Sequence, residues 1–487
     1  MISPSVEPFD EAKYKALMDG LECSEINLRY VKDKILRVDA EYYQKDSLIL
    51  ETVLESMAGK TISAHNGKTD CSAFYPSITG YYSDDRNNIP FLRVNEIVDG
   101  LVVISDKTVF LPEEILKANS KTIALAYPGD IIIAKGGNTL AKVGLVTDEF
   151  SVYATCRDVI ILRTGEMTDL NKFYLWAYLH GSFGQKLMWR SASQTGQPHL
   201  TLKSIDGIHV PEYSVALQET IERLYSQSVY YKQMAQNEYD SASAILRSVV
   251  TTDQIDDSRV SIRSFSQSFG KTGRFDAEYY QSKYEKYTEA LNTKDTVDTL
   301  CILYDRNFVP EAEVEYTYIE LASVGRAGAI VNAERNLGSA LPTRARRQVS
   351  AGQVIISSIE GSLQSCALIT SEFDKSLCST GFYVIDSENI NSETLLVLFK
   401  CELMQALMKQ RCSGSILAGI TKDELLSMPL PRIDENVQRE VAVKVRQSFE
   451  LRDKSKQLLE YAKQAVEMAI EQGEDIALAW LKSKVEQ

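Results

Sequence analysis

The chain lacks most of the patterns by which enzymes are recognised from sequence. Its eight cysteines show none of the short paired spacings of a zinc site, and only four histidines are present to serve a metal centre. The sequence contains no G-x-x-x-x-G-K-[ST] phosphate loop, no H-E-x-x-H and no [ND]-P-P-[YF] motif of adenine methylation. We therefore predict no catalytic residue, no metal site and no cofactor.

Long apolar runs are also missing. No stretch reaches the roughly 18 residues that a membrane-spanning helix requires. The first twenty residues, MISPSVEPFDEAKYKALMDG, lack the basic-then-apolar order of a signal peptide. A chain of this length does not need a disulfide framework, so the scattered cysteines favour reduced thiols. We expect a cytoplasmic protein without a membrane partner.

An excess of positive charge is missing too. The net charge is −14 and the isoelectric point is near 5.0. Taken alone, this argues against a nucleic-acid partner, which usually meets a basic surface. Hydrophobic residues make up 44% and charged residues 25%, as in globular proteins, and 487 residues suggest about two to four domains.

What the chain does contain is a long internal repeat. RVDAEYYQK, at 37–45, returns as RFDAEYYQS at 274–282, with seven of nine positions identical. The segment 128–162 aligns without a gap to 351–385, and HLTLKSIDGIHVPE at 199–212 matches GITKDELLSMPLPR at 419–432. A period of about 220 residues is too long for a solenoid. The repeat predicts two homologous domains.

Each repeated block has the pattern of a mixed helix and sheet domain. Short β-branched runs such as IPFLRV, DIIIA and DVIIL are separated by Gly, Asp and Asn, which predicts strands and turns. One helix is expected within each block, at 171–190 and at 392–411. The predicted fold class is therefore α+β, with two homologous domains.

A long helix follows each block. The segment 214–250 has neither Pro nor Gly, and small residues recur at heptad spacing in both copies. Such residues let two helix backbones approach closely, so we predict a parallel or antiparallel coiled-coil pair; the alternative, that each helix only covers its own domain, stays open. The predicted interface residues are Ile221, Leu224, Ser228, Ala235 and Ala242 of the first helix, and Val441, Ser448, Ser455 and Ala462 of the second.

The predicted order along the chain is an N-terminal helical segment at 1–36, a first domain at 37–211, a long helix with linker at 212–273, a second domain at 274–431 and a last long helix at 432–487. A helix of about 36 residues is about 54 Å long. Two binding domains about 50 Å apart would address duplex patches a little over one helical turn apart, since that turn is about 34–36 Å. Because the two domains differ in sequence, the target would be asymmetric and bipartite.

The chain resembles the specificity subunits of type I restriction–modification systems. The resemblance is carried by NIPFLRVNEI at 88–97, YPGDIIIAKGGNTLAKVGLV at 127–146, SQTGQPHLTLKSIDGIHVP at 193–211 and GSILAGITKDELLSMPLPRID at 414–434. It covers nearly the whole chain in the family's order of domain, helix, domain, helix. It implies a non-catalytic subunit that binds double-stranded DNA and two modification (methyltransferase) subunits, and through them restriction subunits.

The resemblance directs attention to polar loops as the source of base and phosphate contacts. In the first domain the candidates are Lys68, Tyr81, Arg86, Lys135, Asn138, Gln194 and Gln197. In the second domain they are the basic cluster of Arg326, Arg335, Arg344, Arg346 and Arg347, with Gln364, Ser413 and Ser415 in the copies of the first domain's loops. For each residue the alternative is an ordinary solvated loop, and for the arginines it is pairing with distant acids.

Neither domain is basic in sum. Lys and Arg number 17 against 20 Asp and Glu in 37–211, and 15 against 21 in 274–431. These totals fit a specific reader that depends on partner subunits to hold the DNA backbone, rather than a clamp that acts alone. The alternative function is a tandem-domain scaffold that binds another protein or a carbohydrate and has no DNA role.

Two motifs invite a catalytic interpretation. PGDIIIAKGG, with Asp130 and Lys135, faintly resembles a nuclease strand, but its copy AGQVIISSIEG replaces both residues. The duplicated DAEYYQ motif precedes each domain, and we expect it to form a joint between domain and helix; a surface for the modification subunit is the alternative. The joint residues are Arg37, Asp39, Tyr42 and Tyr43, with Arg274, Asp276, Tyr279 and Tyr280 in the second copy.

Overall fold

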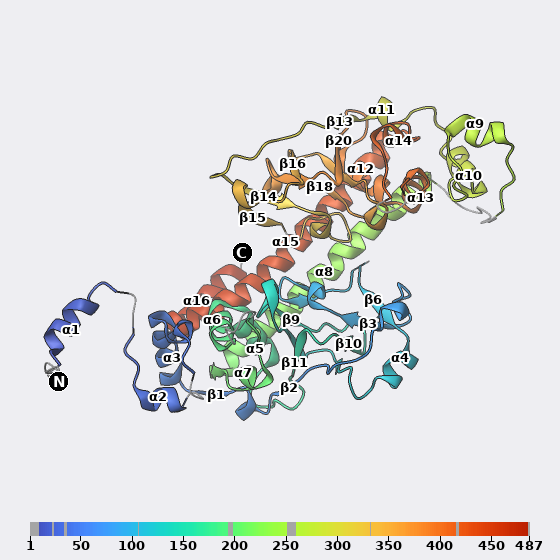
Figure 1. Ribbon diagram of the computed structural model, residues 1–487. Helices are drawn as coiled ribbons and strands as arrows, with labels where there is room; N and C mark the ends of the chain where they lie inside the picture. Colours follow the sequence, from blue (N-terminus) through green and yellow to red (C-terminus); the bar gives the residue numbers. More distant parts are fainter. Residues whose placement is uncertain are drawn as a thin grey trace, which may run out of the picture. The chain divides into compact units, whose positions relative to one another are not determined.

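The computed structural model describes residues 9–21, 24–33, 37–105, 107–192, 198–250, 260–331, 333–414 and 418–485 (Figure 1). The chain divides into two compact units, residues 1–226 with 458–487 and residues 227–457. The N-terminal helical segment consists of α1 (Glu11–Met18) and α2 (Leu28–Asp33). In the described part of the chain, no helix is both long and apolar enough to cross a membrane.

The first unit contains a central sheet with the strand order β2-β11-β8-β9-β5-β4. Its strands are β2 (Lys68–Asp70), β11 (Val159–Arg163), β8 (Ile131–Ala134), β9 (Val143–Leu145), β5 (Leu101–Val102) and β4 (Ile97–Val98). The neighbouring sheet has the order β6-β3-β10-β7. Its strands are β6 (Val109–Leu111), β3 (Ile89–Leu92), β10 (Tyr153–Thr155) and β7 (Leu125–Ala126), and β3 runs parallel to β10.

The second unit repeats the sheet β6-β3-β10-β7 and the part β2-β11-β8-β9 of the central sheet. The order β13-β20-β17-β18 joins β13 (Ile302–Tyr304), β20 (Phe382–Asp386), β17 (Val354–Ser357) and β18 (Cys366–Leu368). The order β15-β14-β19-β16 joins β15 (Glu334–Leu337), β14 (Glu315–Ile319), β19 (Leu377–Ser379) and β16 (Ala345–Gln348), again with one parallel pair, β14 with β19. The internal sequence repeat is therefore a repeat of topology.

Continuous apolar runs become strands that are buried on both faces. Ile131 and Ile133 of β8 enter the core that the helices cover, whereas Ile132 and Ala134 enter the core between the sheets. The alternation follows from the two-residue period of a strand. In the second unit β17 divides its residues in the same way, with Val354 and Ile356 in one core and Ile355 in the other.

The helix expected at 171–190 is two helices, α5 (Lys172–His180) and α6 (Ser182–Ser191), and the one at 392–411 is α12 (Ser392–Lys400) and α13 (Glu402–Arg411). The break at Gly181 is extended, with ψ 169°. It is stabilised because the Gln185 side-chain amide donates to Leu179 O, 2.9 Å away, a carbonyl that the break leaves without an intrahelical donor. Gln405 donates to Phe399 O at the second break, at 2.6 Å.

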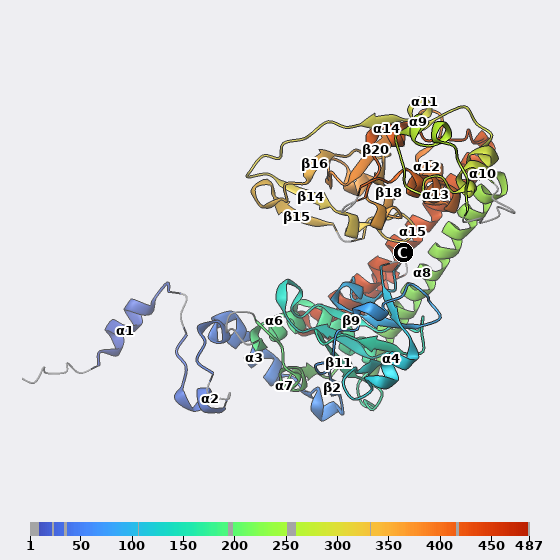
Figure 2. The ribbon, with the colours of Figure 1, turned by 45° about the vertical axis from the view of Figure 1, so that its right-hand side comes forward.

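The long helices are α8 (Val215–Val249) and α15 (Glu435–Gln472), followed by α16 (Glu474–Val485). In the second unit Ser228 Oγ and Ser455 Oγ are 2.8 Å apart, and Ser448 Oγ donates to Ala235 O at 2.6 Å. Residue numbers rise along one helix as they fall along the other, so the helices are antiparallel (Figures 1 and 2). In the first unit Ile221 and Ala462 share one core.

The remaining elements close the two domains. They are α3 (Lys45–Ser56), α4 (Glu113–Ala118), α7 (Leu202–Asp206), α9 (Phe269–Thr272), α10 (Ser282–Leu291), α11 (Val297–Leu300), α14 (Lys422–Leu426), β1 (Gly59–Thr61) and β12 (His209–Pro211). The predicted fold class, two homologous α+β domains with a pair of long packed helices, is confirmed.

Candidate nucleic-acid interface

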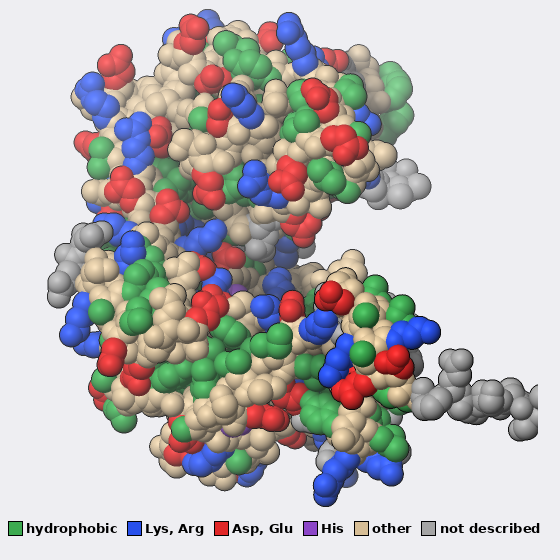
Figure 3. Space-filling model, turned by 90° about the vertical axis from the view of Figure 1, so that its left-hand side faces the viewer, with side chains coloured by type: hydrophobic (Ala, Val, Ile, Leu, Met, Phe, Trp, Pro, Cys, Tyr) green, Lys and Arg blue, Asp and Glu red, His purple; other side chains and the backbone are tan. Residues whose placement is uncertain are grey.

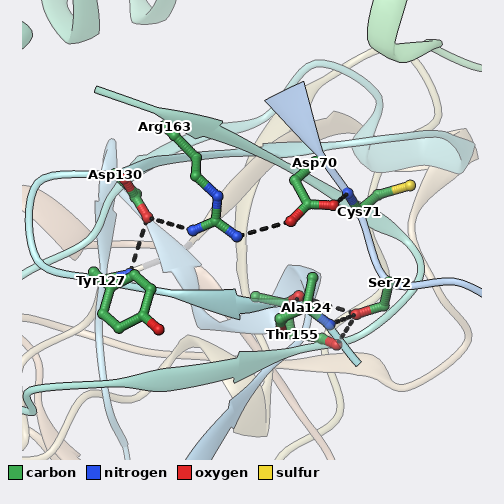
Figure 4. A network of polar contacts seen from close by, with 8 residues as sticks. All are labelled: Asp70, Cys71, Ser72, Ala124, Tyr127, Asp130, Thr155 and Arg163. Atoms are coloured by element: carbon green, nitrogen blue, oxygen red, sulfur yellow. Dashed lines mark hydrogen bonds and ion pairs between the residues drawn. The ribbon is translucent and has the colours of Figure 1, made fainter. Parts of the chain in front are cut away.

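The P-G-D motif forms a turn at the entrance to β8. The backbone N–H of Tyr127 donates to Asp130 Oδ2 at 3.0 Å, and Arg163 links Asp130 (3.3 Å) to Asp70 (2.8 Å) (Figure 4). Burial raises the pKa of Asp130, and the Tyr127 N–H and Arg163 act in the opposite direction. Gly129 has φ 92°, a conformation that glycine adopts without strain.

The copy of this turn keeps the same hydrogen bond without a carboxylate. Gln353 stands where the first domain has Asp130, and its Oε1 accepts the backbone N–H of Ser350 at 2.8 Å. Gly352, with φ 90°, matches Gly129. What the two domains share is a side-chain oxygen that accepts a backbone N–H three residues earlier. We therefore interpret Asp130 as a residue that stabilises the turn.

Two candidate loops meet in the first domain. Leu200 N–H donates to Lys135 O at 2.8 Å, and Gly136 pairs with His199. A Cβ on Gly136 would lie 2.3 Å from His199 Nδ1, so only glycine permits this approach. The loop containing Lys135 and Asn138 therefore lies beside the end of the loop predicted at 193–199. Gln194 and Gln197 fall outside the described residues.

The same two loops meet in the second domain. Glu360 N–H donates to Ala418 O at 3.0 Å, and Ile420 N–H donates to Ser358 O at 2.8 Å. Ser413 and Gly419 exchange two backbone hydrogen bonds, of 2.9 and 3.0 Å. Ser413 and Gln364 are exposed, whereas Ser415 falls outside the described residues.

The other candidates of the first domain differ in how freely their side chains face solvent. Tyr81 and Asn138 are exposed. Lys68 pairs with Glu166 at 2.6 Å, and Arg86 pairs with Glu149 at 2.6 Å. Lys135 Nζ lies 3.7 Å from Cys71 Sγ. A DNA phosphate would have to compete with an acidic partner for Lys68 and Arg86.

The arginine cluster of the second domain is divided between the two edges of one sheet. Arg335 lies on β15, and Arg346 and Arg347 lie on β16, with Arg344 just before it. Arg326, Arg335 and Arg344 are exposed. Arg347 differs from these because it pairs with Asp305 at 2.8 Å and only 12% of its side chain is accessible. Arg347 therefore pairs with a distant acid, which is the alternative stated in the sequence analysis for the arginine cluster.

The duplicated motif forms the same cluster in both domains. We call Arg37, Asp39, Tyr42 and Tyr43 the first clasp. Arg37 Nη1 donates to Ser191 O at 3.1 Å and Nη2 donates to Ala192 O at 2.6 Å. Its other side forms two bonds with Asp39, both of 2.8 Å, and its guanidinium lies 4.4 Å from the Tyr42 ring centre. Tyr43 Oη donates to Arg37 O.

The second clasp consists of Arg274, Asp276, Tyr279 and Tyr280. Arg274 donates to Arg411 O at 3.5 Å and to Cys412 O at 2.7 Å. Its bonds to Asp276 are 2.9 and 2.7 Å, and the Tyr279 ring centre is 4.3 Å away. In each clasp the hydrogen bond from arginine lowers the pKa of the aspartate. In each clasp the first tyrosine, Tyr42 or Tyr279, stacks on the arginine.

A cluster of His65, Asp169 and Glu212 has the composition of a metal site, with ligand atoms within 4.8 Å of one another. However, Lys60 Nζ lies 3.0 Å from Asp169 and 3.4 Å from Glu212. The Lys60 ammonium therefore already pairs with both carboxylates that a cation would need.

The second domain has an ion pair of reversed sign at the matching place. Asp295 and Arg432, 2.7 Å apart, stand where the first domain has Lys60 and Glu212. Both pairs join the first and last segments of a domain, since Lys60 is opposite Val210 in β1–β12 and Thr296 is opposite Pro429. We therefore interpret the cluster as part of the domain closure. In the sequence, the match of Asp295 and Arg432 to Lys60 and Glu212 becomes visible only when the two repeats are aligned at both the first and the last segment of each domain.

Neither a family model nor a curated protein matches the sequence. Among solved structures, the chain is similar to the S subunit of the type I restriction–modification system from M. genitalium, with 11% identity and a TM-score of 0.36 over 85% of this chain and 95% of that chain. It is also similar to the HsdS subunit from Thermoanaerobacter tengcongensis, with 13% identity and a TM-score of 0.26 over 84% and 97%. A third chain, from a structure of type I system assembly, has 14% identity and a TM-score of 0.29 over 84% and 98%.

All three come from type I restriction–modification systems, the family that the sequence resembles.

Proposed function

We propose that this chain is the DNA sequence-recognition subunit of a type I restriction–modification complex. Each α+β domain reads one half of an asymmetric, bipartite target. The chain itself is non-catalytic and holds two modification subunits, and through them restriction subunits. The observation that supports this most directly is the duplication, in which the same domain occurs twice and each copy brings a polar loop pair to one place.

The loop pairs support a reading function because of their composition. Asn138, Gln364 and Ser413 are exposed at or beside the places where the loops meet, and these side chains offer the donors and acceptors that base edges require. The second domain adds exposed Arg326, Arg335 and Arg344. Since the loops differ in sequence between the domains, each domain would read different bases.

The charge distribution supports a reader that works with partners. On the face in Figure 3, acidic and basic side chains are interspersed over each part of the chain. Such a surface offers few phosphate contacts, and phosphate contacts provide most of the affinity for DNA. We propose that the modification subunits supply those contacts, while this chain supplies sequence discrimination.

The proposal is tested by deleting the chain from its host and mapping DNA methylation across the genome. We expect methylation at one bipartite sequence to disappear and to return when the intact chain is restored. In a gel shift, we expect tight binding of that sequence only when the modification subunits are present. Unchanged genomic methylation after deletion would refute the proposal and favour a scaffold that binds protein or carbohydrate.

A further inference from the structure

In each domain a short segment crosses from one sheet to the other directly after an edge strand. We call residues 71–74 the first strap and residues 306–309 the second strap. The first strap follows β2 and the second follows β13, and an aspartate precedes each, in KTDCSAF at 68–74 and ILYDRNFV at 302–309. The two straps therefore occupy the same place in the duplicated fold.

An arginine holds the aspartate in front of each strap. Arg163 pairs with Asp70 at 2.8 Å (Figure 4), and Arg347 pairs with Asp305 at 2.8 Å. Arg163 belongs to β11 and Arg347 belongs to β16, so the two domains fix the same point of the chain from different strands. The start of each strap is thus held by a charge-assisted hydrogen bond, which is stronger than a neutral one.

The middle of the first strap is bonded to the second sheet of its domain. Ser72 Oγ donates to Thr155 O at 2.7 Å and accepts the Ala124 N–H at 2.9 Å (Figure 4). The next residue, Ala73, donates its N–H to Thr122 O at 2.8 Å. The first strap therefore has a fixed backbone up to Phe74.

The second strap is fixed in the same way with different side chains. The Phe308 N–H donates to Arg346 O at 2.6 Å, and the ring centres of Phe308 and Tyr316 are 5.7 Å apart. Asp305, in front of the strap, also pairs with Lys422 at 3.1 Å. The backbone of the second strap is therefore held on both sides of Arg306.

Each strap presents a side chain to solvent that the domain itself does not use. Phe74 is 77% accessible, so its ring contributes little to the core. Arg306 is exposed and, among the residues that the structure describes, it forms no hydrogen bond or ion pair. Side chains on a fixed backbone lose less conformational freedom on binding than side chains on a loose loop.

The straps lie beside residues that we predict to contact DNA. Cys71 of the first strap lies 3.7 Å from Lys135 Nζ. The second strap is bonded to β16, which contains Arg346 and begins directly after the exposed Arg344. Contacts from such cations to phosphate groups fix the position of a protein on DNA, and neighbouring side chains then reach the bases.

We infer that the straps read bases, with Arg306 reading a guanine in one half-site and Phe74 reading a thymine in the other. The inference rests on the proposed function. In the major groove, the guanidinium fork of arginine matches O6 and N7 of guanine, and an aromatic ring packs against the methyl group of thymine. Because the anchors are shared and the exposed side chains differ, each domain selects a different base from the same place.

The test uses the full chain assembled with its modification subunits and bound to its own target, which methylation mapping identifies. Each guanine is replaced in turn by 7-deazaguanine, which lacks the N7 acceptor, and each thymine by uracil, which lacks the methyl group. Gel shifts measure the affinity. For the wild-type complex we expect one guanine analogue to weaken binding about tenfold. One uracil in the other half-site should weaken it about fourfold, the value of one buried methyl group.

The variants connect each analogue to one strap. Arg306→Ala should be insensitive to the guanine analogue and Phe74→Ala to the uracil, while each keeps the other response. Arg306→Lys should retain part of the guanine response, since lysine offers a single point charge. Ile49→Ala and Arg432→Ala are matched controls, because each removes an exposed side chain of the same kind from the same domain. We expect both controls to keep both responses.

The inference is overturned if Arg306→Ala or Phe74→Ala keeps the wild-type response to its analogue, or if a control loses that response. Equal weakening of all sequences by Arg306→Ala would indicate a phosphate contact and would also overturn it. The analogues act on the wild-type complex, so the absence of any sensitive guanine or thymine decides against the inference without a variant. A wild-type complex that prefers no sequence would refute the proposed function itself.

Discussion

Individual arginines of one sequence cluster have different environments. The run TRARRQ places Arg344, Arg346 and Arg347 within four residues, yet only Arg347 is taken into an ion pair and covered by neighbouring groups. The ion pair with Asp305, a residue distant in the sequence, causes this difference and is not visible in the run itself. Net charge over a short segment therefore overstates the number of side chains available to a phosphate.

For Arg344→Ala and Arg346→Ala, we predict that the slope of log binding constant against log salt concentration decreases by about 1 for each arginine–phosphate pair that the substitution removes. Arg347→Ala should leave the slope unchanged and lower the free energy of unfolding by about 2 kcal/mol, since a hydrogen bond to a charged group is removed. Fluorescence anisotropy of the complex with labelled DNA at several salt concentrations measures the slope. A reduced slope for Arg347→Ala alone would contradict this assignment.

His180 makes the stability of the first unit depend on pH. Burial lowers the pKa of its imidazole to about 4, with Lys463 acting in the same direction and Glu460 and Glu467 opposing. Because the ordinary pKa is 6.5, the unfolded chain binds a proton that the folded chain does not, and stability falls as pH drops from about 6.5 towards about 4.

We predict that His180→Phe, which keeps a ring against Trp176, removes about 2 kcal/mol of the decrease in stability between pH 7 and pH 5. Denaturant unfolding of both proteins at the two pH values measures this difference. Equal pH dependence in the two proteins would show that other groups determine the decrease.

At the scale of elements, small residues set the separation of the two long helices. Ser228, Ser448 and Ser455 are buried, and their hydroxyl groups bond across the helix pair. A larger side chain has no space between backbones that are this close.

We predict that Ser455→Leu lowers the free energy of unfolding by about 1–3 kcal/mol through overpacking. Lys454→Leu is the matched control, since it adds a leucine at the adjacent exposed position and should change stability by less than about 0.5 kcal/mol. Denaturant melts of the two variants give the comparison. Similar values for both would mean that Ser455 is not tightly packed.

The sequence predicts those helices and strands well that are marked by a local pattern of residues. Buried strands such as DIIIA are marked by short β-branched runs, and the helix at 214–250 is marked by its heptad spacing and its lack of Pro and Gly. The sequence does not reveal the helix breaks at Gly181 and Cys401, because apolar residues continue on both sides of each break. The glutamines that stabilise the breaks donate to backbone carbonyl groups, and such contacts leave no pattern in the sequence. The clasps were seen as a duplicated motif, but their acceptors lie 154 and 155 residues away in the first domain.

At the scale of the whole molecule, the internal repeat predicts the domain organisation and the family resemblance, whereas the composition predicts neither. A net charge of −14 argues against DNA, whereas the repeated motifs and the duplicated order of domain and helix point to the specificity subunits. Net charge is a sum over the whole chain, whereas the recognition of DNA bases depends on a few exposed groups.

The reversed ion pairs that close the two domains also affect which segments of a duplicated chain pair with each other as the chain folds. Homologous domains in one chain risk exchanging equivalent strands. If the first segment of one domain paired with the last segment of the other, Lys60 would face Arg432 and Asp295 would face Glu212. Like charges on neighbouring positions across a strand pair repel each other. In each domain the ion pair therefore favours that domain's own closing segment over the equivalent segment of the other domain.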